Sequence, residues 1–138
     1  MERLSVDIES AGSGRFVLRL AGELDLTGTE GFWGVLEPLL MPGGRVVLDC
    51  AKLGFLDSSG IRVLVLGARR AAAAEASVRL AAPQHAVRRT LELAGAQGFL
   101  ASYPTVEDAL DDALDDGAGD AAGADDAAGA DGAAGVGG

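Results

Sequence analysis

The stretch that decides the fold is Phe55-Leu56-Asp57-Ser58-Ser59-Gly60-Ile61, a polar segment between two apolar ones. The run before it, residues 45–50, has the apolar residues Val46-Val47-Leu48 at its centre and is typical of a buried strand. After it, apolar residues recur at helical spacing, namely Ile61, Leu64, Val65 and Ala68. The sequence therefore predicts a strand, a loop and a helix over about 59–74, with Ser58 near the N-cap.

Two interpretations of Ser58 follow from this position. Asp, Ser and Gly before an apolar run are ordinary helix-capping residues, and Ser59 is a candidate for that role. The first turn of a helix also carries unpaired N–H groups and the positive end of the helix dipole, which favour a phosphate group. The local residues alone leave both interpretations open.

The net charge of −10 is concentrated at one end of the chain. Residues 1–110 hold 13 acidic and 11 basic side chains, whereas residues 111–138 hold eight aspartates and no lysine or arginine. We therefore predict one domain over 1–116 and a disordered acidic Ala/Gly/Asp tail over 117–138. A nearly neutral domain lacks the positive field that nucleic acid or an anionic membrane attracts, so we expect neither as a partner.

The N-terminal third predicts a hairpin followed by a helix. Leu4, Val6 and Ile8 alternate with polar residues, and a glycine-rich turn separates them from a second apolar run over 16–20. Thr27-Gly28-Thr29-Glu30 has the spacing of a capping box. We expect the helix that follows to bend or end near Glu37 because Pro38 lacks a backbone donor.

The rest of the chain repeats a strand and helix alternation. Val78, Leu80 and Ala82 predict a strand, and a helix follows Pro83. A last short strand over 99–101 and a helix capped by Thr105 complete the series, with Leu114 on the apolar face of that helix.

This order predicts an α/β fold of about four to five strands and four helices. The sheet is expected to be mixed, with an antiparallel hairpin at its N-terminal edge and parallel strands elsewhere. Loops that follow parallel strands gather at one edge of a sheet, so the segment from Asp25 to Thr29 should adjoin the Ser58 loop.

Enzymatic and metal chemistry find little support in the sequence. His85 is the only histidine, Lys52 is the only lysine and no phosphate-binding glycine loop precedes it. Cys50, the only cysteine, reads as a small apolar residue that ends a strand. The carboxylates Glu23, Asp25, Asp49 and Asp57 match no metal-binding loop, so we predict no metal, no cofactor and no catalytic residue.

Several of these segments together resemble the STAS domain, and more narrowly the bacterial anti-sigma factor antagonists. The resemblance rests on Gly22-Glu23-Leu24-Asp25, Val46-Val47-Leu48-Asp49 and the stretch 55–61. It continues through 86–95 and 105–110 and spans roughly residues 4–114.

The resemblance implies a non-enzymatic partner-switching protein. In that family the unphosphorylated antagonist binds an anti-sigma factor that is also a serine kinase, and the sigma factor is released. The kinase then phosphorylates the first serine of the motif, here Ser58, which ends the complex, and a serine phosphatase restores the protein. The implied partner-binding residues are Asp25, Asp57, Ser58, Ser59, Gly60 and Ile61.

Two alternatives remain at this point. One is a structural STAS subunit of a stress-signalling or lipid-transport assembly, and the other is a nucleotide-binding or weakly hydrolytic protein. No signal peptide and no bilayer-length apolar run is present, so we expect a cytoplasmic location.

Overall fold

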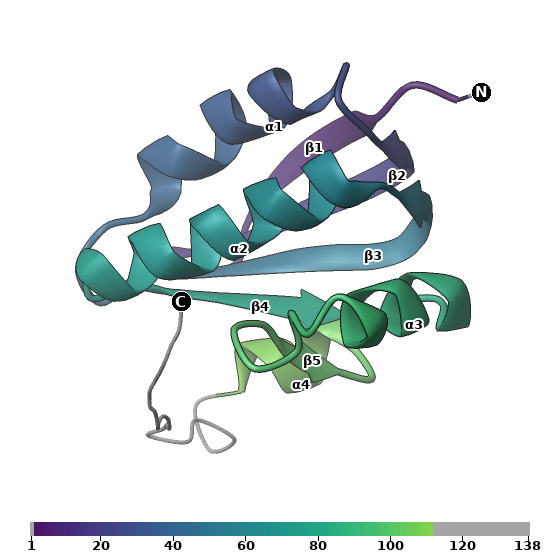
Figure 1. Ribbon diagram of the computed structural model, residues 1–138. Helices are drawn as coiled ribbons and strands as arrows, with labels where there is room; N and C mark the ends of the chain where they lie inside the picture. Colours follow the sequence, from purple (N-terminus) through teal and green to yellow (C-terminus); the bar gives the residue numbers. More distant parts are fainter. Residues whose placement is uncertain (1, 112–138) are drawn as a thin grey trace.

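The computed structural model describes residues 2–111, which form one mixed sheet with helices on both faces (Figure 1). The strands are β1 (Ser5–Ser10), β2 (Arg15–Leu24), β3 (Arg45–Leu56), β4 (Ser77–Ala81) and β5 (Ala101–Tyr103). The helices are α1 (Thr29–Leu36), α2 (Ser58–Ala73), α3 (His85–Leu93) and α4 (Val106–Leu110), with a 3₁₀ turn, η1, over Glu37–Leu39. The predicted domain end at 116, the tail over 117–138 and Leu114 lie outside the described residues.

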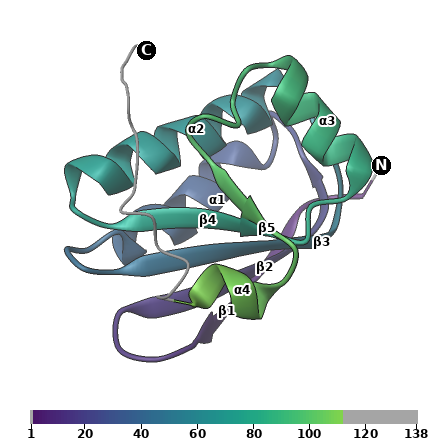
Figure 2. The same cartoon turned by 90° about the horizontal axis from the view of Figure 1, so that it is seen from below.

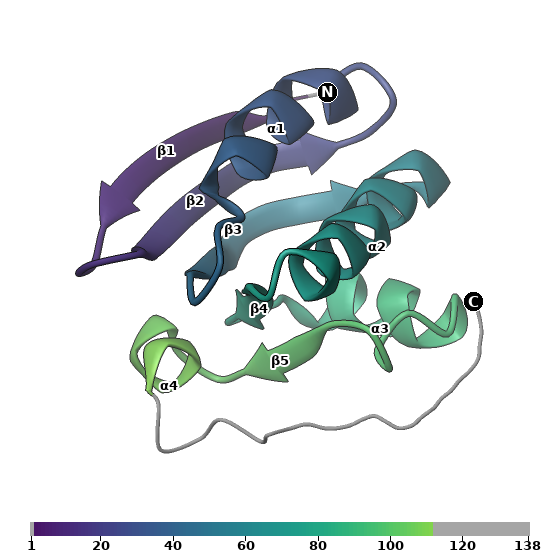
Figure 3. The same ribbon diagram turned by 90° about the vertical axis from the view of Figure 1, so that its left-hand side faces the viewer.

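The sheet has the order β1-β2-β3-β4-β5. β1 and β2 pair antiparallel, and the other three pairs are parallel. The predicted α/β class and mixed sheet are therefore confirmed. The carboxyl ends of β2, β3 and β4 point to the same edge of the sheet, where β2 leads into α1 and β3 into α2 (Figure 3).

Two apolar layers hold the helices against the sheet. The larger layer joins the sheet to α1, α2 and α3, and its fully buried members include Leu18, Phe32, Leu48 and Leu64. The opposite face carries Val17, Val47 and Ala81, which pack against Ala109 of α4. Figure 2 shows α4 on the other side of the sheet from α1 and α2. Alternate residues of β2 and β3 thus face different layers, as strand geometry requires.

The strand β3 is longer than its predicted range of 45–50. Its partner β4 ends at Ala81, opposite Asp49, so the part of β3 beyond Asp49 pairs with β2 alone. That part is half solvated and contains Ala51 and Lys52, which gave it the composition of a loop. Lys52, which follows the predicted strand, is an exposed residue of β3.

Of three other element predictions, one needs correction and two are confirmed. The last strand is Ala101–Tyr103 and not 99–101, because Phe99 follows a turn and is 42% exposed. α1 ends at Leu36, as predicted, and η1, which contains Pro38, follows directly. Thr105 caps α4 as predicted, and its hydroxyl oxygen accepts a hydrogen bond from the amide of Asp108 at 3.0 Å.

The amino end of the sheet binds the end of α4 through arginines that the sequence analysis did not single out. Arg79, only 3% exposed, donates to the carbonyl of Ala109 at 2.8 Å. Arg15 and Arg45 both donate to the carbonyl of Leu110, at 3.0 and 3.2 Å. These cations satisfy carbonyl groups that a helix C-terminus leaves unpaired, which compensates for the burial of their charge.

Cys50 lies within β3 and does not end it, and its side chain is buried. Burial, with a smaller effect of the Asp49 charge, raises the pKa of its thiol to about 12.

We predict that an aromatic disulfide reagent that releases thionitrobenzoate does not modify Cys50 in the folded protein at pH 8, because the reactive thiolate of Cys50 is suppressed. After denaturation the same reagent should label this one thiol. Rapid labelling of the native protein, followed by thionitrobenzoate absorbance, would contradict this environment.

Candidate functional site

The predicted junction between the two loops is present at the carboxyl edge of the sheet. The amide of Asp57, at the start of α2, donates to the carbonyl of Leu24, the last residue of β2, at 3.3 Å. The segment from Asp25 to Thr29 therefore starts beside the first turn of α2. The prediction that these two segments adjoin is confirmed.

The N-terminus of α2 is capped by Asp57. Its Oδ1 accepts hydrogen bonds from the amide of Gly60 at 2.9 Å and from the hydroxyl of Ser59 at 2.6 Å. The bond from Ser59, and after it the bond from Gly60, holds the pKa of the Asp57 carboxyl below its usual value. Ser59, a candidate for the capping residue in the sequence, instead donates a hydrogen bond to the capping residue Asp57.

Ser58 occupies the first position of α2 and is exposed. Within residues 2–111 its hydroxyl makes no hydrogen bond, whereas the hydroxyl of Ser59 is engaged by Asp57. The hydroxyl of Ser58 is thus accessible at the positive end of a 16-residue helix. Of the two serines, Ser58 is the one whose modification would disrupt no contact.

Gly60 has a packing role that the sequence did not reveal. A Cβ at this position would lie 2.5 Å from the carbonyl oxygen of Leu24 and 3.2 Å from the Cβ of Leu56. Only glycine lets the first turn of α2 approach the end of β2 this closely. Gly60 is buried and Ile61 packs against the core, so both lie beneath the surface that Ser58 exposes.

Asp25 shapes the loop between β2 and α1. Its Oδ1 accepts hydrogen bonds from the amide and hydroxyl of Thr27, at 3.0 and 2.6 Å. The predicted capping box is therefore wrong in detail, because Thr27 bonds to Asp25 and the N-cap residue Gly28 contributes no side-chain bond. The short side chain of Asp25 stabilises a local turn before the helix.

The same segments border a groove between α1 and α2, hereafter the α1–α2 groove. It has a volume of about 290 Å³ and is lined by Leu26, Thr29, Glu30, Trp33, Ser59, Arg62, Val63 and Leu66. Leu26 and Leu66, one on each side of the groove, are 74% and 47% exposed and offer apolar surface there. Sequence reasoning missed this groove, although the spacing of Ser58, Arg62 and Leu66 along α2 could have indicated an exposed face.

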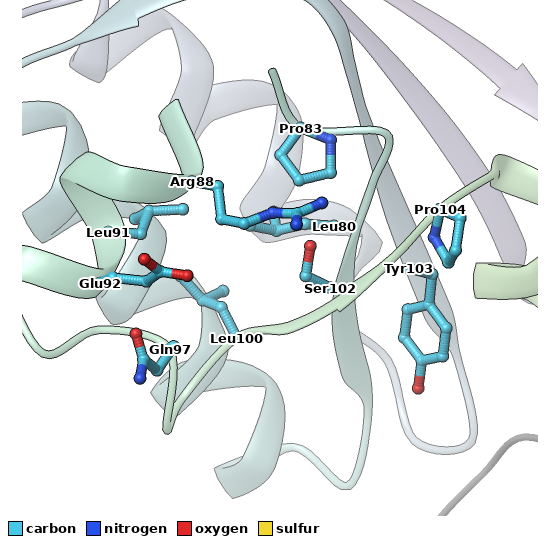
Figure 4. A pocket seen from close by; sticks show the side chains of 10 residues that line it. All are labelled: Leu80, Pro83, Arg88, Leu91, Glu92, Gln97, Leu100, Ser102, Tyr103 and Pro104. Atoms are coloured by element: carbon cyan, nitrogen blue, oxygen red, sulfur yellow. The ribbon is translucent and has the colours of Figure 1, made fainter. Parts of the chain in front are cut away.

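A second pocket, of about 370 Å³, lies between α3 and the strands β4 and β5 (Figure 4). Its floor is apolar, with Leu80, Leu91 and Leu100, and Arg88 reaches over that floor toward Ser102. None of its lining residues comes from α2 or the β2–α1 loop. The pocket is therefore separate from the Ser58 site.

Among the described residues, no group of three histidine, cysteine or carboxylate side chains is placed to hold a metal ion. None of the described helices has the length and apolar character to cross a membrane. His85, the only histidine, is exposed at the start of α3.

Comparison with known proteins assigns the family. Residues 9–102 match the family model described as "Mlab, STAS domain", which covers well over half of the chain. The chain belongs to the STAS domain family. Comparison of the sequence with curated proteins finds no match.

Solved structures agree with this assignment. The anti-sigma factor antagonist SpoIIAA in its unphosphorylated form is 25% identical, with a TM-score of 0.66, and the match covers 78% of this chain and 94% of that one. The phosphorylated form of SpoIIAA from Bacillus is 23% identical, with a TM-score of 0.61, and the match covers 77% of this chain and 96% of that one. An anti-sigma factor antagonist from Mycobacterium paratuberculosis is 24% identical, with a TM-score of 0.68, and the match covers 78% of this chain and 91% of that one.

The fold also occurs within longer proteins. The murine Slc26a9 anion transporter is 16% identical, with a TM-score of 0.63, and the match covers 80% of this chain but 22% of the transporter. At that identity the likeness concerns the fold alone. STAS domains are regulatory or binding modules, so the function of this one has to be argued from its surface.

The packing of Gly60 leads to a first prediction for this site. Gly60→Ala should lower the free energy of unfolding by about 1–3 kcal/mol, because the added methyl group meets the backbone of Leu24. Gly34→Ala, in α1, is the matched control, since nothing lies within 4 Å of a Cβ there. It should raise stability by up to about 1 kcal/mol. Urea denaturation of both variants measures these effects, and equal effects would contradict the close contact.

The cap at Asp57 leads to a second prediction. Asp57→Ala should cost about 1 kcal/mol of stability at pH 7, as loss of an N-cap does. Because the pKa of Asp57 is lowered by folding, its contribution is present above about pH 3.9 and is lost as the pH falls through the folded-state pKa.

The cost of Asp57→Ala should therefore shrink in acid. Asp57→Asn is the control, because asparagine caps helices without titrating. Denaturation at a series of pH values tests this dependence. A cost of Asp57→Ala that stayed constant down to pH 2 would contradict a role for the ionised carboxylate.

Proposed function

We propose that this protein is an anti-sigma factor antagonist that is switched by phosphorylation of Ser58. The unphosphorylated form binds an anti-sigma factor that is a serine kinase, and the phosphorylated form releases it. The observation that carries the proposal is the hydroxyl of Ser58, exposed at the start of α2 and without a hydrogen bond in the described chain. SpoIIAA, which shares this fold, exists in unphosphorylated and phosphorylated forms.

The proposed binding surface contains Asp25, Asp57, Ser58 and Ser59 together with the α1–α2 groove. Its exposed leucines, Leu26 and Leu66, offer apolar area to a partner. Gly60 and Ile61 contribute by holding the first turn of α2 against β2 and the core. We propose that the STAS domain ends near residue 116.

The phosphate acts at the interface with the partner. It adds about −1.5 to −2 charges at pH 7 beside the carboxylate of Asp57. At a helix N-terminus that charge is compatible with the fold, so the domain itself need not change. Docking a partner then requires desolvation of a dianion, which favours release.

The experiment uses purified protein, a candidate anti-sigma kinase and ATP, with intact-mass analysis and mapping of the modified site. We predict one phosphate, on Ser58, its loss in Ser58→Ala and its retention in Ser59→Ala. Ser58→Ala should keep the complex with the kinase. Ser58→Asp should weaken it, toward the ~150-fold expected of a coupling of ~3 kcal/mol. An active kinase that leaves Ser58 unmodified would exclude the mechanism.

The second candidate is a structural STAS subunit of a stress-signalling or lipid-transport assembly. The family model that matches residues 9–102 is described as "Mlab, STAS domain" and not as an anti-sigma factor antagonist, which is the observation that favours it. Size-exclusion chromatography with light scattering on native complexes separates the two candidates. A stable large assembly that persists after phosphorylation would favour the subunit.

A further inference from the structure

Ser58, Arg62 and Leu66 form a line along the exposed face of α2. They are four residues apart, so they are neighbours on one side of the helix. All three side chains are exposed, whereas Gly60, Val63, Leu64 and Gly67 are buried on the opposite side. The side chain that follows Ser58 along this face is therefore that of Arg62.

Arg62 makes no ion pair or hydrogen bond within residues 2–111. The other two arginines of α2 are engaged, since Arg70 pairs with Glu37 at 3.2 Å and Arg69 lies 5.3 Å from the ring centroid of Phe99. Arg62 instead lines the α1–α2 groove. Its guanidinium is available to an acceptor that arrives from outside.

Helix geometry brings Arg62 toward Ser58. The Cα–Cβ bonds of a helix tilt toward its N-terminus, so a long side chain extends over the turn that precedes its own Cα. An acidic group at one position and a basic group four residues later is also the favourable order for a helical ion pair. A phosphate on Ser58 would meet these conditions with Arg62.

The side chains around this end of α2 are acidic and would repel a phosphate, so a nearby cation would stabilise it. Asp25 follows the last residue of β2, Glu30 lines the groove from α1, and Asp57 caps α2. Arg62 is the cation that α2 supplies within one turn of Ser58. Guanidinium binds phosphate oxygens through paired N–H donors.

We propose that Arg62 binds the phosphate group of phosphorylated Ser58 and is thereby withdrawn from the α1–α2 groove. The proposal rests on the proposed function, in which Ser58 is the phosphorylated residue. In the unphosphorylated protein Arg62 is a donor on the docking surface. After phosphorylation that donor is occupied, so the modification both adds negative charge and removes a partner-binding cation.

The test places phosphoserine at position 58 during translation, so that no kinase is needed. A ³¹P NMR titration of the full chain then measures the second pKa of the phosphate. This pKa should be about 0.2–0.7 units higher in Arg62→Gln than in the parent protein, because the ion pair favours the dianion. Arg62→Lys should fall between the two, because a single ammonium replaces the guanidinium fork.

Arg70→Gln is the matched control. It removes the same charge from the same helix, but it lies eight residues beyond Arg62 and about 18 Å along the axis from Ser58. Its phosphate pKa should equal that of the parent. Equal values in the parent and Arg62→Gln, or an equal shift in Arg70→Gln, would overturn the assignment.

The two proposals fail in different experiments. If no kinase modifies Ser58, the switching function fails while the titration still reports on Arg62. If the titration shows no effect of Arg62, phosphorylation can still control release through the charge on Ser58 alone.

Discussion

The close contact between the end of β2 and the first turn of α2 is the constraint on which the rest of the site depends. The carbonyl of Leu24 accepts a hydrogen bond from the amide of Asp57, and Gly60 lies against the same carbonyl without a Cβ. This contact fixes where α2 begins relative to the neighbouring loop. It thereby sets the exposure of Ser58, the engagement of Ser59 and the side of α2 that borders the groove.

A second glycine, Gly22 of β2, also allows a close backbone contact. Gly22 has φ +97°, and a Cβ there would lie 2.4 Å from the carbonyl oxygen of Arg3. The pairing of β2 with β3 also shifts register between Gly22 and Glu23. Backbone approach therefore explains the glycine in each of the two motifs, Gly22-Glu23-Leu24-Asp25 and Asp57-Ser58-Ser59-Gly60. A motif whose glycines serve packing can hold its polar residues in one fixed arrangement.

Much of the architecture was predictable because apolar periodicity reports burial directly. The alternation in β1, the apolar start of β3 and the stripe on α2 each identified their element. The end of β3 was missed because it pairs on one side only, so its composition resembles a loop. The arginines at 15, 45 and 79 were missed because their partners are carbonyls of α4, which no sequence pattern displays. The position of the polar residues 57–59 at the start of α2 was predictable from the sequence. Which serine hydroxyl is engaged by Asp57, and which is exposed, depends on hydrogen-bond directions that only the three-dimensional structure supplies.

The arginine contacts to α4 lie at the opposite end of the domain from Ser58. Arg15 and Arg45 begin their strands, whereas Ser58 follows the last residue of β3, so the two sites are about 35 Å apart along that strand. They also belong to opposite faces of the sheet, because α4 packs on the face away from α2 (Figure 2). Asp111, the last residue that the structure describes, therefore lies remote from the groove. A surface tether or fluorescent reporter attached at Asp111, which is exposed, would leave the edge of the sheet that carries Ser58 open to solution.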